Sequence, residues 1–129
     1  MSSLMVMDAS AILCLLGGER GADQVAAALP GSVIGAANYA EVVGKLRDSG
    51  MTAEAADEAL GALDLDVRPL TRAQAARAGS LRPETKEAGL SLGDRACIAL
   101  ALDLNGTAIT CDREWRKPKI EGLKLRVVR

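Results

Sequence analysis

Short apolar runs alternate with longer helical segments along the chain, and this alternation restricts the fold more than any other feature. The runs predicted to form strands are residues 4–7, 33–35, 66–68, 107–110 and 125–128. The segments predicted to form helices are residues 10–16, 22–28, 38–48, 52–63, 71–88 (with an interruption at Gly79 or Pro83) and 91–104. Strands separated by helices favour a mostly parallel sheet covered on both faces. At 129 residues the chain has the usual size of one domain, so we expect a single α/β domain over residues 1–129.

The residue types that are scarce exclude several kinds of chemistry. The chain has no histidine, which excludes Ser-His-Asp and Cys-His catalysis and histidine-ligated zinc. Trp115 and Tyr39 are its only aromatic residues, too few for a platform on which RNA bases stack. Any reaction must therefore use carboxylates, hydroxyls, amines or thiols.

The cysteines and the apolar stretches indicate where such a chain works. Cys14, Cys97 and Cys111 form an odd set without C-x-x-C spacing, and each lies in or beside an apolar stretch. This is typical of buried thiols rather than of disulfides or a metal site. The longest apolar stretch, residues 97–102, is far shorter than the roughly 20 residues that span a bilayer. We expect a soluble protein of the reducing cytoplasm with no membrane partner.

Charge is unevenly distributed along the chain. Residues 113–129 hold seven Lys or Arg against two Glu, whereas the whole chain has a net charge of −1. One interpretation is a solvated basic segment. The other is an edge that attracts phosphate on an otherwise acidic protein, with Arg113, Arg116 and Lys117 as candidate RNA contacts.

This arrangement of strands and helices predicts that four acidic residues lie close together. Asp8 directly follows the first predicted strand, and Asp112 follows the fourth. Glu41 and Asp94 lie in the first turns of two predicted helices. In a right-handed parallel unit, the end of a strand and the start of the next helix share one edge of the sheet. The four carboxylates are therefore expected to meet at the carboxyl edge, where open α/β sheets place their ligands.

A simpler interpretation of the same residues is helix capping. Ser91 to Asp94 and Asn38 to Glu41 resemble capping boxes, and the other two carboxylates could be plain N-caps. Four anions on one edge would also repel one another and raise their pKa values unless a cation lay between them. Ligands that are all oxygen suit Mg²⁺ or Mn²⁺ and not zinc.

The segments that contain these acids resemble a known family. They are residues 7–11 (M-D-A-S-A), 40–41 (A-E), 89–97 (G-L-S-L-G-D-R-A-C) and 110–115 (T-C-D-R-E-W). In this order and spacing they resemble PIN-domain nucleases, most closely the VapC-type toxins of bacterial type II toxin–antitoxin pairs. The family pattern places its four acids on Asp8, Glu41, Asp94 and Asp112, with Ser10 and Thr110 as hydroxyl-bearing neighbours.

The resemblance implies both a fold and an activity. The fold is a three-layer α/β/α domain with a five-stranded parallel sheet. The activity is Mg²⁺-dependent endoribonuclease cleavage of RNA, with Mn²⁺ as a substitute, in a homodimer that a cognate antitoxin inhibits. Asp8 and Asp94 would hold Mg²⁺, while Asp112 and Glu41 would complete the shell, bind a second ion or orient water. Ser10 and Thr110 would support the carboxylates by hydrogen bonds.

Three points stay open at this stage. Arg95 and Arg113, each beside an acid, are equally well interpreted as phosphate contacts or as surface charges. A receiver-like Mg²⁺-binding phosphoacceptor domain would share the acidic carboxyl edge, but Asp8 is followed by Ala9 and Ser10 rather than belonging to an acidic pair. A PIN-like module that only binds RNA or protein would not need all four acids.

Overall fold

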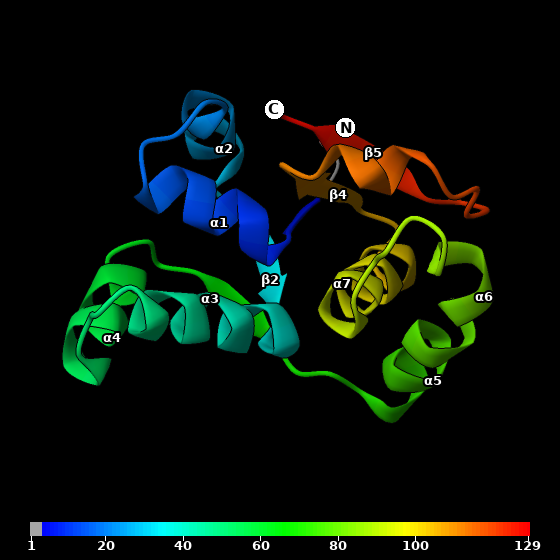
Figure 1. Ribbon diagram of the computed structural model, residues 1–129, viewed down its shortest axis with the longest axis horizontal. Coiled ribbons are helices and arrows are strands. Elements are labelled where there is room, and N and C mark those ends of the chain that lie inside the picture. The colour runs from blue at the N-terminus through cyan, green and yellow to red at the C-terminus, as the bar shows by residue number, and fades with distance from the viewer. Residues whose placement is uncertain (1–3) are drawn as a thin grey trace.

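The computed structural model describes residues 4–129 and contains a five-stranded sheet in which all paired strands are parallel (Figure 1). The strands are β1 (Met5–Met7), β2 (Val33–Gly35), β3 (Asp66–Arg68), β4 (Thr107–Thr110) and β5 (Lys124–Val127), in the spatial order β3-β2-β1-β4-β5. The chain leaves β1 for β2 on one side and later returns to β4 on the other. The order therefore reverses between β1 and β4, the point where open α/β sheets form a crevice at their carboxyl ends.

Seven α-helices and one 3₁₀-helix connect the strands within residues 4–129. They are α1 (Ala9–Leu16), α2 (Ala22–Ala28), α3 (Ala36–Asp48), α4 (Ala53–Gly61), α5 (Arg72–Ser80), α6 (Arg82–Thr85), α7 (Leu92–Asp103) and the 3₁₀-helix η1 (Arg113–Arg116). The Thr52 and Thr71 hydroxyls cap α4 and α5 by accepting from backbone N–H groups three residues on. The starts of these helices are thus fixed by local sequence.

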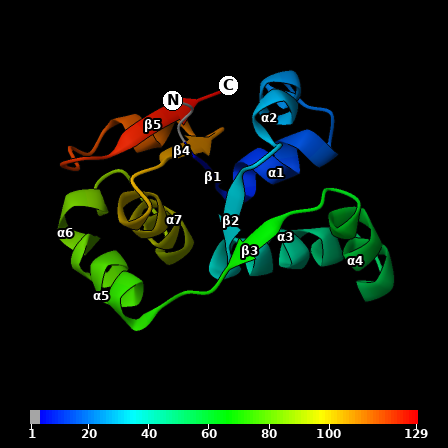
Figure 2. The same cartoon turned by 180° about the vertical axis from the view of Figure 1, so that it is seen from behind.

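The helices cover the sheet on two faces because neighbouring strand residues point in opposite directions. Met7, Ile34 and Ile109 pack with residues of α1 to α4. Val6, Val33 and Ala108 pack with α7 and with Trp115 of η1. Figures 1 and 2 show these two groups of helices on opposite sides of the strands. Burial on both faces explains why the inner strands β1 and β2 are apolar runs in the sequence, whereas the edge strands β3 and β5 carry charged residues.

The predicted architecture is confirmed, with shifts at several boundaries. The segment expected as one helix over residues 71–88 is broken at Leu81, between α5 and α6, two residues from each predicted interruption point. Helix α3 begins at Ala36 and not at residue 38. The 3₁₀-helix η1 was not predicted, since four residues are too few for a periodic pattern.

The placement of the cysteines agrees with the sequence prediction. Cys14, Cys97 and Cys111 are free and buried. Burial raises the pKa of the Cys111 thiol, with a further contribution from the neighbouring Cys14, to about 12. Between residues 4 and 129, no helix is long and apolar enough to cross a membrane.

Candidate active site

The four predicted acids line one cavity of about 180 Å³ at the carboxyl edge of the sheet. Its lining residues are Asp8, Ala9, Ser10, Leu13, Glu41, Lys45, Asp94 and Asp112. Asp8 and Asp112 follow β1 and β4, while Glu41 and Asp94 are carried by α3 and α7. The fold therefore brings together residues separated by about a hundred positions, as expected for the crevice between β1 and β4.

Asp8 is the most enclosed of these acids, with only 2% of its surface exposed. It caps α1, and its carboxylate accepts from the Ala11 N–H (2.8 Å), the Ser10 hydroxyl (2.8 Å) and the Thr110 hydroxyl (2.8 Å). Burial raises the pKa of Asp8 to about 6, because hydrogen bonds from Ala11, Thr110 and Ser10 offset only part of the desolvation. The fold thus holds a carboxylate that is costly to ionise without a cation.

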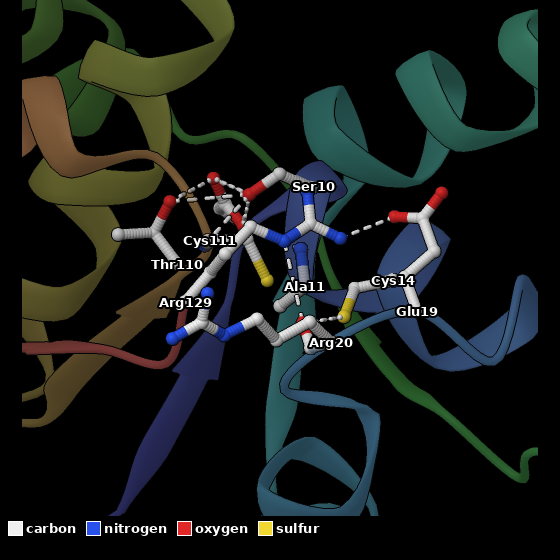
Figure 3. Close-up of polar contacts among 9 residues, drawn as sticks. Ser10, Ala11, Cys14, Glu19, Arg20, Thr110, Cys111 and Arg129 are labelled. Atoms are coloured by element: carbon white, nitrogen blue, oxygen red, sulfur yellow. Dashed lines mark hydrogen bonds and ion pairs between the residues drawn. The ribbon is translucent and has the colours of Figure 1, made fainter.

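Ser10 and Thr110 join Asp8 to β4 through a small hydroxyl network. Figure 3 shows the Ser10 and Thr110 side chains beside each other. Their hydroxyl oxygens lie 3.2 Å apart, and both hydroxyls also bond the Asp8 carboxylate. The Ser10 oxygen accepts from the Cys111 N–H (3.0 Å), and the Thr110 oxygen accepts from the Asp112 N–H (3.1 Å). The two hydroxyls therefore contact the carboxylate and fix the chain that carries Asp112.

Asp94 lies in the first turn of α7 and forms the predicted capping box with Ser91. Its Oδ2 accepts from the Ser91 N–H (2.8 Å), and the Asp94 N–H donates to the Ser91 hydroxyl (3.2 Å). Burial raises the pKa of Asp94 despite these bonds, and the charge of Asp112 raises it further. The cap interpretation is therefore correct for this residue, and the same carboxylate also lines the cavity.

Glu41 is held differently. Because α3 begins at Ala36, Glu41 lies in the second turn of the helix, and the capping box predicted for Asn38 to Glu41 is wrong. The Asn38 side chain donates from Nδ2 to Glu41 Oε1 (3.0 Å) and to the Gly93 carbonyl of α7 (3.0 Å). Burial raises the pKa of Glu41, and the nearby Asp94 raises it further.

In three of the four carboxylates that line the cavity, one oxygen accepts a hydrogen bond from the protein and the other does not. The oxygens bonded to the protein are Asp94 Oδ2, Glu41 Oε1 and Asp112 Oδ1, the last accepting from the Glu114 N–H (2.9 Å). Within residues 4–129, the second oxygen of each has no hydrogen-bond partner from the protein. The acids are thus oriented in advance and retain donor oxygens for a ligand.

This donor set fits a hydrated Mg²⁺ or Mn²⁺ ion. In the described part of the chain, no three His, Cys, Asp or Glu side chains are already grouped closely enough to hold a metal together. Mg²⁺ usually keeps several waters and takes only one or two protein carboxylates directly. A cavity of about 180 Å³ has room for such waters, each of which occupies about 30 Å³ in the liquid. A cation there would also relieve the repulsion that raises the pKa of Asp94.

The four cations predicted as phosphate contacts lie in different environments in the structure. Arg95 is 7% exposed and donates to the Ala78 carbonyl (3.0 Å), so its side chain joins α7 to α5 and does not reach the surface. This placement contradicts both interpretations of Arg95 as an exposed charge. Arg113 donates from Nε to the Arg129 carbonyl (3.0 Å) and lines, with Asp112, a depression of about 750 Å³. Arg116 is exposed, and Lys117 pairs with Glu114 at 2.5 Å.

The depression beside the acid cavity is lined by charges of both signs. Arg129 donates to the Arg20 carbonyl (3.3 Å) and forms an ion pair with Glu19 (Figure 3). These residues line the depression together with Arg113, Cys111 and Asp112. Arg113 and Arg129, the two cations of this depression described above, thus already have partners within the protein.

Sequence reasoning missed three residues around the cavity. Lys45, one helical turn after Glu41, lines the cavity and lowers the pKa of Glu41; the i, i+4 spacing was the available signal. Asn38 was noticed only as a cap. Gly93 carries no local signal, because its role depends on the approach of Glu41 from another helix.

Comparisons with known proteins agree with this geometry. The family model described as PIN domain matches residues 5–121. No curated protein matches the chain in a sequence search. A toxin–antitoxin complex from Klebsiella pneumoniae contains a chain that is similar over 97% of this chain and 98% of that one (21% identity, TM-score 0.74).

Two further solved structures share the fold at similarly low identity. VapBC2 from Rickettsia felis, bound to a DNA fragment from its promoter, matches over 96% and 98% of the two chains (16% identity, TM-score 0.74). PAE2754 from Pyrobaculum aerophilum matches over 97% and 92% (20% identity, TM-score 0.61). The family match favours the PIN interpretation over a receiver-like domain. The matched residues 5–121 include four of the five strands and all four acids. The chain therefore belongs to the PIN domain family.

Proposed function

We propose that this chain is a divalent-metal-dependent endoribonuclease and the toxin of a type II toxin–antitoxin pair. The observation that carries the proposal is the cavity lined by four carboxylates, three of which keep one oxygen without a protein partner within residues 4–129. Family membership supports nuclease chemistry, and the absence of histidine is compatible with it, since hydrolysis at such a site requires only carboxylates and a metal.

Each residue of the site has a proposed task. Asp8 and Asp94 would hold Mg²⁺, and Asp112 and Glu41 would complete its surroundings and orient water. Ser10 and Thr110 keep the Asp8 carboxylate in place through their 2.8 Å hydrogen bonds. When bound, Mg²⁺ supplies Lewis-acid chemistry that activates water and neutralises charge on the phosphate oxygens.

The proposal is tested by incubating purified protein with single-stranded RNA in Mg²⁺, in Mn²⁺ and in EDTA. We expect internal cleavage with either metal and none in EDTA. Single-stranded DNA of the same sequence is the substrate control, and the Asp94→Asn variant separates this activity from contaminating ribonuclease. Cleavage that persists in EDTA, or that is equal in the Asp94→Asn variant, would reject a carboxylate–metal nuclease. Transfer of a phosphoryl group onto Asp8 without RNA cleavage would instead support a receiver-like domain.

The proposed partners follow from the solved complexes. The Klebsiella pneumoniae and Rickettsia felis structures are toxin–antitoxin and VapBC assemblies. By analogy we propose that a small antitoxin binds this chain and suppresses cleavage, and that the chain forms a homodimer in the cytoplasm. Light scattering of the purified protein measures the oligomeric state. Co-expression with the product of the adjacent reading frame tests the antitoxin, since a complex that does not cleave RNA is the expected outcome.

A further inference from the structure

Asn38 is a fully buried amide that links two of the acid-bearing helices. Its side chain is 1% exposed, and Nδ2 lies 3.0 Å from both Glu41 Oε1 and the Gly93 carbonyl oxygen. Helices α3 and α7 lie against each other at this edge of the sheet (Figure 1). One amide group therefore touches the carboxylate of Glu41 and the backbone immediately before Asp94.

The neighbouring glycines leave space for this contact. A Cβ atom on Gly93 would overlap the Glu41 carboxylate, so Glu41 rests directly against the backbone of α7. A Cβ atom on Gly35 would lie 3.2 Å from Asn38 Oδ1, tighter than ordinary contact. Small residues at both positions thus allow Asn38 and Glu41 to enter the gap between the helices.

Glu41 differs from the other acids in how it is held. Asp94 and Asp112 accept from backbone N–H groups no more than three residues away, so their orientation is set within one segment. Glu41 instead accepts from the Asn38 side chain, which also donates to the Gly93 carbonyl of α7, 55 positions further along the chain. Its position is thereby tied to the turn that carries Asp94.

The Asn38 side chain is less stabilising than an apolar side chain of similar shape would be. Its Oδ1 is buried and has no hydrogen-bond partner in the part of the chain that the structure describes. A buried acceptor left without a partner costs stability, which an apolar residue of similar shape would avoid. Such a local cost is expected where a residue serves the site rather than the fold.

We propose that Asn38 is a positioning residue that clamps Glu41 against the Asp94-bearing turn of α7, so that both acids face one divalent cation. The inference rests on the proposed metal-dependent nuclease. Two carboxylates repel each other, and Glu41 is half-buried with solvent on its other side. Without the clamp, the Glu41 side chain turns toward water, and the cavity loses one of its oriented oxygens.

Gln74 provides a matched control for the structural part of this role. It is also a buried amide between two helices, since it lies on α5 and donates from Nε2 to Asp103 Oδ2 of α7 at 2.9 Å. It does not line the acid cavity. Asn38→Leu and Gln74→Met each replace one bridging amide by an apolar side chain of similar size, but only the first affects Glu41.

The test is the affinity of the full chain for Mn²⁺ alone, measured by isothermal titration calorimetry without RNA, together with the metal-free melting temperature. We expect Asn38→Leu to weaken Mn²⁺ binding by about tenfold, within the range seen when a partner of a metal ligand is removed. Gln74→Met should leave Mn²⁺ binding unchanged, whatever its melting temperature. Equal Mn²⁺ affinity in folded Asn38→Leu and wild type would overturn the inference.

A second pair of variants keeps the test decisive if Asn38→Leu does not fold. Gly93→Ala places a methyl group where the Glu41 carboxylate lies while keeping Asn38, and Gly44→Ala adds the same methyl on α3 with nothing within 4 Å. We expect weaker Mn²⁺ binding in Gly93→Ala only, and unchanged binding there would refute the clamp. A wild-type chain that binds no Mn²⁺ would overturn the metal site and the clamp together. Normal wild-type binding with unaffected variants would remove only the clamp.

Discussion

The acid cavity and the basic segment of residues 113–129 lie next to each other, but the fold controls them to very different degrees. In the cavity, Asp8 is 2% exposed and bonded to three groups, and each of the other acids has one oxygen fixed by the protein. In the basic segment, Arg116 and Lys117 are exposed, and ion pairs there join surface residues. The acid side chains have a fixed geometry, whereas the exposed cations Arg116 and Lys117 mainly supply charge.

This contrast predicts different roles for the two regions, catalysis for the acid cavity and attraction of RNA for the exposed cations. Buried charged groups are costly, so they persist only where hydrogen bonds and a ligand compensate for desolvation. Exposed ion pairs contribute little and are weakened by salt. We therefore expect changes in the cavity to alter cleavage and stability strongly, and changes in the basic segment to alter only RNA binding.

The largest effect is expected from removing one cavity carboxylate. Asp94→Asn keeps an acceptor for the Ser91 N–H but lacks the negative charge that Mg²⁺ requires. We expect RNA cleavage to fall by at least about a hundredfold, because removing a ligand costs more than removing its partner. Asp57→Asn, an exposed aspartate on α4, is the control and should retain wild-type rates. If both variants cleave equally well, the contrast between the two regions disappears.

Stability without metal should depend on pH through Asp8. Its pKa rises from 3.8 in the unfolded chain to about 6 in the folded protein, so folding favours the protonated form. This contribution is complete below pH 4 and is lost as the pH rises through 6, an effect of roughly 3 kcal/mol at 1.36 kcal/mol per unit. Urea unfolding in EDTA at pH 4.5 and 7 covers about two-thirds of this effect, roughly 2 kcal/mol. Asp8→Asn should show a smaller loss over this range, and an identical loss would assign the pH dependence to other groups.

Adding Mg²⁺ at neutral pH should reverse part of that loss. A ligand that binds only the folded state stabilises it by about 2.7 kcal/mol at one hundred times its dissociation constant. We expect the melting temperature to rise with Mg²⁺ in the wild type and to stay constant in the Asp8→Asn/Asp94→Asn double variant. A rise of the same size in the double variant would place the stabilising ion elsewhere.

The smallest effect is expected from the basic segment. Changing Arg113, Arg116 and Lys117 together to Gln should weaken RNA binding and flatten its salt dependence, by about 0.7 in slope for each phosphate that the variant no longer neutralises. The rate at saturating RNA should stay near the wild-type value, because the four acids are untouched.

A matched triple variant controls for charge alone. Arg72, Arg82 and Lys86 are exposed cations on and beside α5 and α6, and their replacement by Gln removes the same charge from another part of the surface. Circular dichroism checks that both variants fold, since Arg113 also bonds the Arg129 carbonyl. An unchanged salt slope in the folded Arg113 variant would leave the basic segment without a role in binding RNA.

The sequence predicted the features that depend on local pattern. The apolar strands, the caps at Asp8 and Asp94 and the meeting of four acids at one edge all follow from short-range signals combined with the handedness of parallel units. The contacts of Asn38 with Gly93 and of Arg95 with Ala78 depend on how helices pack, which no single segment encodes. That is why Arg95 was expected at the surface and Asn38 only as a cap.

The pairing of β1 with β4 also determines when the four acids can come together during synthesis. The hydrogen bond from Thr110 to Asp8 spans 102 residues, and Asp112 lies two residues after the end of β4. Contacts this distant in sequence form slowly, because a long loop must close before they are made. A nascent chain on the ribosome carries an incomplete set of acids until β4 has emerged and docked beside β1. The ribosome is thus not exposed to a complete site before nearly the whole domain has been translated.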